Sequence, residues 1–296
     1  MSIGIAPATT RLPGTLSSLF ASAKWRLMLT YALFNLENLL RLAQPFVLGW
    51  AINDLLAGTY LGLLVFVAQH LGHVAIGTWR QMYDTRVFTK LYTDLVIRLV
   101  SEQRGQGIDV SRVAARSSLS REFVEFFERQ VPLVVRSAYS IVGAMAMVAW
   151  YDAMLVPLCG LLIVPVCLLN LRFSRQTHRL SRQLHDELEH EVNAIDTGSA
   201  TVARGHFGRV AGWRVKLSDA EAINFGLTEL FVLGLLAAVL IRFCSAATAS
   251  IGDIFAVFRY VLMFIVGLDS VPQVVQHVSR MRDIRQRLCG NASRVD

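Results

Sequence analysis

Apolar residues are concentrated in six stretches of the chain, each long enough to cross a bilayer as a helix. A helix needs about 20 mostly apolar residues to span the hydrocarbon core, and lone strands cannot satisfy their backbone hydrogen bonds in lipid. We therefore predict an all-α membrane protein with six transmembrane helices. The predicted spans cover roughly residues 25–57, 60–79, 131–150, 153–171, 225–243 and 251–275.

The polar segments between these spans are of two kinds. Three connections are very short: residues 56–60, 151–153 and 244–250. Two segments, 80–130 and 172–216, are long and carry apolar residues at helical spacing. At about 1.5 Å per residue, their helices would continue the spans by about 25–30 Å. Each long segment turns at a patch of small residues, RGQGIDVSRVAARSS or IDTGSATVARGH, so we predict two long helical hairpins.

Basic residues are distributed unequally among these segments. The long segments and the C-terminal tail are rich in Arg, whereas the short connections contain neither Lys nor Arg. Cytoplasmic loops of membrane proteins carry the excess of Lys and Arg, so we predict cytoplasmic hairpins and cytoplasmic termini in a plasma (inner) membrane. This topology accounts for the net charge of +7, and we therefore expect no nucleic-acid partner.

The overall composition fits the same class. Hydrophobic residues make up 54% of the chain and charged residues 17%, against about 25% charged in soluble domains. We predict an N-terminal cytoplasmic segment (1–24), a six-helix domain (25–288) and a C-terminal tail (289–296). The four cysteines show no CxxC spacing, so we expect no disulfide framework, no zinc site and no cofactor.

Four sequence segments, taken in their order along the chain, resemble segments of a known family. They are QPFVLGWAINDLLAG, GQGIDVSRVAARSSLSREFVEFF, EVNAIDTGSATVARGHFGR and ASIGDIFAVFRYVLMFIVGLDSVPQVV. Together with six spans, short outer connections and two inward hairpins, they resemble the transmembrane domain of type I ABC exporters. The resemblance covers about residues 25–288. It implies a half-transporter that pairs with a second copy or a related half, and hairpin tips that contact an ATPase.

The sequence motifs of an ATPase domain are not found in these 296 residues. Exporters of this family carry it after the sixth helix, but the chain contains no GxxxxGK[ST] loop, no Gly-Lys pair and no LSGGQ signature. We therefore expect no ATP binding and no enzymatic activity from this chain. Either a separate ATPase subunit docks on it, or something other than ATP drives it, or it no longer transports. The candidate docking residues lie at the two hairpin tips: Arg112, Arg116, Arg204 and His206.

Charged residues inside spans are the main candidates for function, because each costs about 2.5–3.5 kcal/mol at a helix centre on insertion scales. In the first span, Glu37, Arg41 and Gln44 fall on one helical face, and Glu37 precedes Arg41 by the four residues that favour an ion pair. Such a pair could pack the bundle or line a cavity. Arg136 and Arg242 add positive charge that would favour anionic cargo or lipid headgroups if they point inward.

The sixth span has a polar stripe about 120° wide at 100° per residue. Such a stripe is unsuited to lipid, so it faces either a water-filled pathway or a dimer partner. Val261 and Phe264 fall on the opposite face. The stripe contains Arg259, Val266, Asp269, Ser270, Gln273, Gln276, His277 and Arg280.

Histidines allow two further interpretations. His185 and His190 each have a carboxylate at i,i+4, a spacing that can hold a metal, but it is also ordinary on a solvated, charged helix. His70 and His73 in the second span are either hydrogen-bonded packing residues or a proton relay.

Three functions fit the sequence. The first is a membrane subunit of an ABC-type transporter that docks a separate ATPase. The second is an ATPase-free, proton-driven transporter in which Glu37, Asp269 and the histidines carry protons. The third is a non-transporting scaffold or accessory subunit of another membrane complex.

Overall fold

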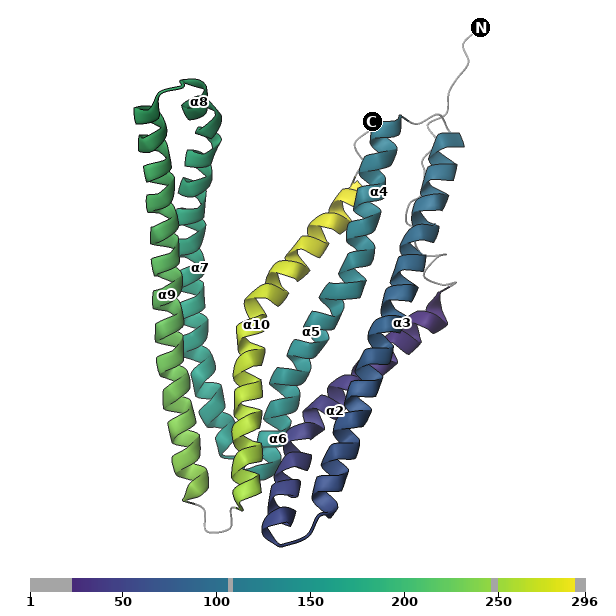
Figure 1. The fold of residues 1–296 in the computed structure, drawn as a ribbon, viewed down its shortest axis with the longest axis vertical. Helices are drawn as coiled ribbons and strands as arrows, with labels where there is room; N and C mark the ends of the chain where they lie inside the picture. The colour runs from purple at the N-terminus through teal and green to yellow at the C-terminus, as the bar shows by residue number, and fades with distance from the viewer. Residues whose placement is uncertain (1–22, 106–108, 246–249, 291–296) are drawn as a thin grey trace. The chain divides into compact units, whose positions relative to one another are not determined.

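The computed structural model describes residues 23–105, 109–245 and 250–290, and the regular elements in these ranges are all helical (Figure 1). Three helices reach 40 residues or more, which at about 1.5 Å per residue is twice the thickness of a hydrocarbon core. The elements are α2 (Lys24–Leu56), α3 (Leu61–Gly105), α4 (Val110–Glu125), η1 (Phe126–Gln130), α5 (Val131–Ala138), η2 (Tyr139–Gly143), α6 (Ala144–Tyr151), α7 (Leu155–Glu189), α8 (Glu191–Asp196), α9 (Ala200–Cys244) and α10 (Ile251–Gly290).

Five helical segments are long and apolar enough to cross a membrane. They cover Leu61–Ser101, Ser120–Tyr151, Leu155–Asp196, Ala200–Cys244 and Ile251–Val275. The 33-residue helix α2 is not among them, since polar side chains such as Asn35, Glu37 and Arg41 interrupt its apolar sequence. The chain is therefore a multi-pass, all-α membrane protein, and its first span stays a prediction.

The helices group into two compact units. One comprises residues 1–147 and 250–296, the other residues 148–249. In the first unit, α2 lies along both α3 and α10 (Figure 1). The α2–α3 connection is a tight turn at Gly58, whose φ of 81° requires glycine, and the backbone N–H of Gly62 donates to the Asp54 carboxylate at 2.7 Å.

Two glycines allow α2 and α10 to approach closely. A Cβ on Gly252 would lie 2.0 Å from the Gly49 carbonyl oxygen, which leaves no room for any side chain. Asn53 closes this contact: its Oδ1 accepts a bond from the Gly252 N–H at 2.8 Å, and its Nδ2 donates to Ser250 Oγ at 2.8 Å. Small residues commonly mark such contacts in membranes, where close backbone packing replaces the hydrophobic driving force.

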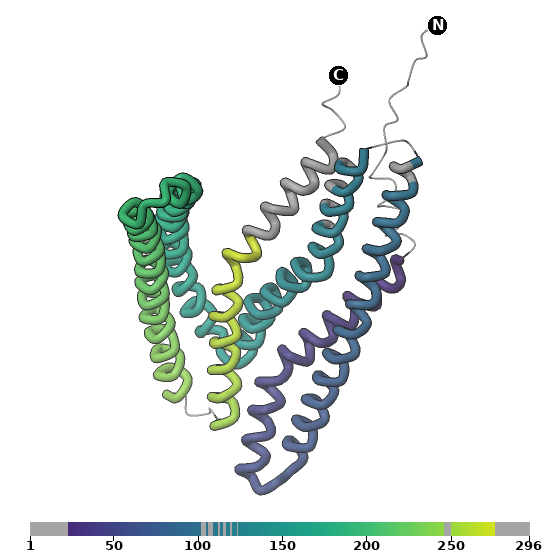
Figure 2. Tube along the Cα trace, turned by 45° about the horizontal axis from the view of Figure 1, so that its top comes forward, coloured from purple at the N-terminus to yellow at the C-terminus, as the bar shows by residue number. Residues whose placement is uncertain are grey.

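The second unit is a long hairpin of α7 and α9 joined by the short helix α8 (Figure 2). Its interior is apolar, with Leu155, Cys159, Val239 and Phe243 buried along the two helices. The turn from α8 into α9 passes through Gly198, whose φ is 60°.

The span predicted at 131–150 is not one regular α-helix. The π-helical turn η2 interrupts it between α5 and α6, and a second π-helical turn, η1, directly precedes it. Each π turn makes a polar contact with α2: the Tyr31 hydroxyl donates to the Phe127 carbonyl oxygen at 3.0 Å, and the Tyr139 hydroxyl donates to Asn35 Oδ1 at 3.0 Å. π turns are rare within α-helices and are frequent at functional sites.

Candidate charge cluster and polar surfaces

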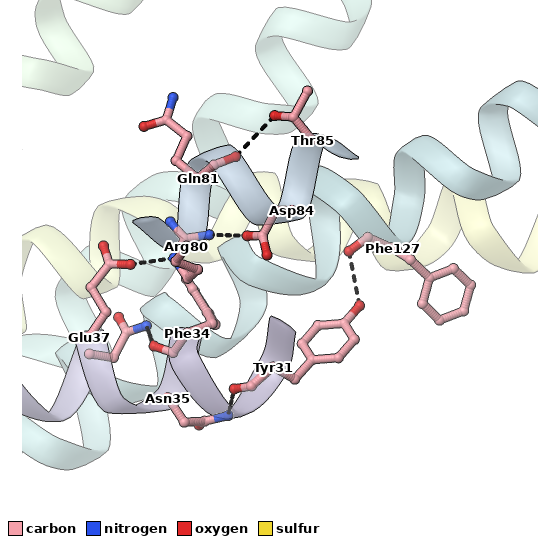
Figure 3. Close-up of polar contacts among 10 residues, drawn as sticks. Tyr31, Phe34, Asn35, Glu37, Arg80, Gln81, Asp84, Thr85 and Phe127 are labelled. Carbon is pink, nitrogen blue, oxygen red and sulfur yellow. Dashed lines mark hydrogen bonds and ion pairs between the residues drawn. The ribbon is translucent and has the colours of Figure 1, made fainter. Parts of the chain in front are cut away.

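A largely buried charge triad joins α2 to α3. The Arg80 guanidinium binds Glu37 of α2 through Nε and Asp84 of its own helix through Nη1 (Figure 3). The three side chains are only 14%, 17% and 13% exposed. The guanidinium also lies 5.0 Å from the ring centroid of the buried Phe34, a distance suited to a cation–π contact. This triad holds two carboxylates against one guanidinium.

The triad corrects the prediction for the first span. Glu37 does not form its ion pair with Arg41, because Arg80 approaches from α3 and occupies the Glu37 carboxylate. Sequence reasoning placed Arg80 and Asp84 in a polar connecting segment and missed their role. The only local signal was the i,i+4 spacing of Arg80 and Asp84.

The other polar residues of α2 and α3 form a second group. Gln44 Nε2 lies 3.3 Å from His70 Nδ1, and Gln69 Nε2 donates to the Leu40 carbonyl oxygen at 2.6 Å. His70 is thus a hydrogen-bonded histidine. His73 differs, since its Nδ1 is buried and has no hydrogen-bond partner among the described residues.

Two of the exposed arginines in this unit are predicted pathway residues. Arg41 on α2 and Arg136 on α5 make no ion pair with any described residue.

Helix α10 is segregated over only part of its length. Arg259, Asp269 and Gln273 are exposed and Val261 and Phe264 are 0% exposed, but Val271 and Val275, on the same side as Phe264, are 36% and 58% exposed. The role of the polar stripe therefore stays a prediction. Ser270 is half-buried, and its hydroxyl lies 2.7 Å from that of Ser137 on α5. The side chain of His277 lies outside the described residues.

In the second unit, Arg242 is paired. Its Nε lies 2.9 Å from Asp152 Oδ2 in the connection between α6 and α7, so its charge is locally compensated. Although burial opposes ionisation of Asp152, the Met154 backbone N–H and the Arg242 guanidinium hold the pKa of that carboxyl below its ordinary value.

The tip of the α7–α9 hairpin has a buried polar pair beneath an exposed surface. His206 is 1% exposed, and its Nδ1 lies 3.0 Å from Glu187 Oε1, which also accepts a bond from Arg209 Nε at 2.9 Å. His206 therefore positions the tip from within. Arg204 is exposed. Four exposed apolar side chains lie on α8 and on the first turns of α9, and we call them the tip patch: Val192, Ile195, Val202 and Phe207.

The other predicted tip cannot be compared in the same way, because the side chains of Arg112 and Arg116 lie outside the described residues. The sequence left open whether His185 and His190 bind a metal or belong to a solvated helix. In each, Nδ1 lies 2.7 Å from the backbone carbonyl oxygen one turn earlier, that of Ser181 for His185 and that of Asp186 for His190.

We compared the sequence with curated proteins and with protein families. None of the curated proteins compared with the chain matches it. A family described as ABC transporter transmembrane region matches residues 16–252. The match covers α2 to α9 and ends at the start of α10, so the polar stripe, which begins at Arg259, lies beyond it. Because the match extends over most of the sequence, the chain belongs to the ABC transporter transmembrane region family.

Proposed function

We propose that this chain is a membrane subunit of an ABC-type transporter that pairs with a second copy or a related half and docks an ATPase lying outside these 296 residues. The observation that carries the docking is the tip patch. Val192 is 75% exposed and Ile195 58% exposed on the short helix α8. Apolar side chains gathered at the end of a long helical hairpin are suited to a protein partner, since contiguous exposed apolar surface marks interaction sites.

The proposed topology places the tip patch in the cytoplasm, together with both termini, in the plasma (inner) membrane. The Lys/Arg distribution supports it. The six-span arrangement adds α2 to the five candidate spans. The chain itself would neither bind nor hydrolyse ATP, since its sequence has no phosphate-binding loop.

Purification in mild detergent tests the docking. The unaltered chain should co-purify with a protein that contains GxxxxGK[ST]. Val192→Glu and Phe207→Glu should reduce the recovery of that protein about tenfold or more, because each places a charge in the apolar contact. The matched control is Val215→Glu, at a 58% exposed position further along α9. Equal recovery with all three variants would exclude the tip patch as the docking surface.

The pathway is proposed to include the exposed face of α10. Cysteines placed at Arg259 and Gln273 should react with small water-soluble thiol reagents, whereas cysteines at Val261 and Phe264 should not, since those positions are 0% exposed. The experiment needs a background in which the native cysteines are replaced. Equal reactivity at the four positions would remove the stripe from the pathway.

A proton-driven transporter is the second candidate, and the charge triad favours it. Two carboxylates share one guanidinium, and Asp84 Oδ1 is buried without a hydrogen-bond partner among the described residues. A proton on Asp84 would neutralise the surplus negative charge. If transport in proteoliposomes follows an imposed pH gradient without ATP, and if Asp84→Asn abolishes it, this candidate replaces the first.

A further inference from the structure

A groove lies between α7 and α9, on the polar part of the long hairpin. Its volume is about 430 Å³, and it is lined by Gln176, Arg179, Leu180, Gln183, Trp213 and Lys216. The four lining residues of α7 follow one face of that helix, and the two of α9 are three residues apart. A groove of this size falls within the range of about 300–1,000 Å³ that small-molecule sites occupy.

Contacts on both sides of the groove hold the two helices in register. Toward the apolar end of the hairpin, Asn224 Nδ2 of α9 donates to Asn170 Oδ1 of α7 at 3.5 Å. Toward α8, Arg209 Nε of α9 donates to Glu187 Oε1 of α7 at 2.9 Å. The helices run antiparallel between these contacts (Figure 1), so side chains from both reach the same groove.

The groove is positively charged, and no carboxylate lines it. Arg179 and Lys216 are exposed and form no ion pair with any described residue. Lys216 Nζ lies 4.1 Å from the ring centroid of Trp213, a distance suited to a cation–π contact. Around the groove, residues 172–183 and 211–218 carry five arginines and one lysine but neither Asp nor Glu. Like charges so close together raise the energy of the folded chain unless anions compensate them.

The level of the groove along α7 indicates where such an anion comes from. The apolar stretch of α7 ends at Leu171, and Gln176 lies about 7 Å further along the helix. The headgroup layer on each side of a bilayer is about 5–8 Å thick, so the near end of the groove lies beside lipid headgroups. The Cα–Cβ bonds of a helix tilt toward its N-terminus, which in α7 is the membrane end, and a long arginine side chain such as that of Arg179 extends well along a helix.

We propose that this groove binds the headgroup of an anionic phospholipid from the adjacent leaflet. The Arg179 guanidinium presents a planar fork of donors that matches phosphate oxygens, and the Lys216 ammonium adds a second positive charge from α9. The amides of Gln176 and Gln183 are suited to hydrogen bonds with headgroup hydroxyls. This site goes beyond the proposed transport function and does not rest on it, since it requires only that α7 and α9 cross the membrane.

Equilibrium binding of labelled short-chain lipids to the purified full-length chain in neutral detergent tests the proposal. Phosphatidylglycerol should bind saturably and about tenfold more tightly than phosphatidylcholine, whose choline cation is repelled by Lys216 and offers no hydroxyl to the glutamines. Arg179→Gln/Lys216→Gln should remove that preference, whereas Arg179→Lys/Lys216→Arg should keep most of it, because both charges and one fork remain. The matched control is Arg182→Gln/Arg214→Gln, which removes the same charge from exposed positions of the same helices outside the groove. It should leave the preference unchanged.

Lysine acylation gives a second measurement that needs no variant. The chain has three lysines, and bound phosphatidylglycerol should protect Lys216 from an amine-reactive reagent while the exposed Lys90 of α3 stays reactive. The proposal is overturned by an undiminished preference in Arg179→Gln/Lys216→Gln, by an equal loss in the control, or by an unprotected Lys216. Millimolar inorganic phosphate that displaces the lipid would assign the groove to a water-soluble anion and would also overturn it. A chain that binds phosphatidylglycerol here but moves nothing in proteoliposomes would keep this site and remove the transport function.

Discussion

The two units of this protein are stabilised internally by different forces. In the unit that contains α2, α3 and α10, polar groups from different helices meet inside the bundle: Glu37 with Arg80, Asn53 with Gly252, and Ser137 with Ser270. In the α7–α9 hairpin the ion pairs lie toward the ends, at Arg242 with Asp152 and at Glu187 with Arg209 and His206. Between these two ends of the hairpin the described interior is mainly apolar. It contains one long hydrogen bond, in which Asn224 Nδ2 donates to Asn170 Oδ1 at 3.5 Å.

This difference matters because the bilayer is itself apolar. Packing of apolar side chains gains little from leaving lipid, so directional bonds and close backbone contacts must specify how membrane helices fit together. The first unit has both, and it also contains the candidate pathway residues. We conclude that geometry is more tightly specified in the first unit than in the hairpin, and that equivalent substitutions should have unequal effects.

The largest expected effect is at Arg80. Arg80→Gln leaves Glu37 and Asp84 buried and uncompensated, and should lower the free energy of unfolding by about 3–5 kcal/mol. Unfolding by SDS in mixed micelles measures it. The matched substitution in the hairpin is Arg242→Gln, whose half-exposed ion pair should contribute about 0–1 kcal/mol.

The triple variant Glu37→Gln/Arg80→Gln/Asp84→Asn separates charge from packing. It removes all three charges and should recover much of the stability that Arg80→Gln loses, because no buried charge is left unpaired. Equal losses for Arg80→Gln and Arg242→Gln would contradict the comparison between the units.

The second effect is steric and concerns Gly252. Gly252→Ala places a Cβ against the Gly49 carbonyl oxygen and 2.6 Å from Asn53 Oδ1, so α2 and α10 must separate. We expect a loss of about 1–3 kcal/mol in the same unfolding assay. In the hairpin, Gly234→Ala meets no atom within 4 Å and should be neutral or stabilising by up to about 1 kcal/mol. A neutral Gly252→Ala would mean that the close approach is dispensable.

The smallest effect is the pH dependence of the hairpin. The lowered pKa of Asp152 means that its carboxylate stabilises the folded state above the pKa of the unfolded chain, and that this contribution is lost as pH falls through the folded pKa. Between neutral and acidic pH we expect a decrease of at most about 1 kcal/mol at this half-exposed pair. Arg242→Gln should reduce that decrease, and an unchanged pH profile in this variant would remove Arg242 as its cause.

Local sequence was sufficient for the class of the protein and for most of its helices. The apolar stretches that predict spans beginning near residues 60, 153, 225 and 251 coincide with α3, α7, α9 and α10, because helix length and hydropathy are properties of contiguous residues. The face of α10 was predictable only in part: a 100° rotation per residue separates the exposed Arg259 from the buried Val261 and Phe264, but it does not predict the exposure of Val271 and Val275.

The partners of the charged residues were decided only by tertiary structure. Spacing within α2 favours Glu37 with Arg41, but the rotation of α3 against α2 brings Arg80 to Glu37 from 43 residues away, and that rotation depends on packing along the whole helix pair. Each π turn is joined to α2 by a tyrosine hydroxyl, and the buried His206 is bound by Glu187, 19 residues earlier on α7. Hydropathy and spacing describe one helix at a time, whereas an ion pair, a π turn or a buried histidine is specified by the side chain that a second helix places beside it.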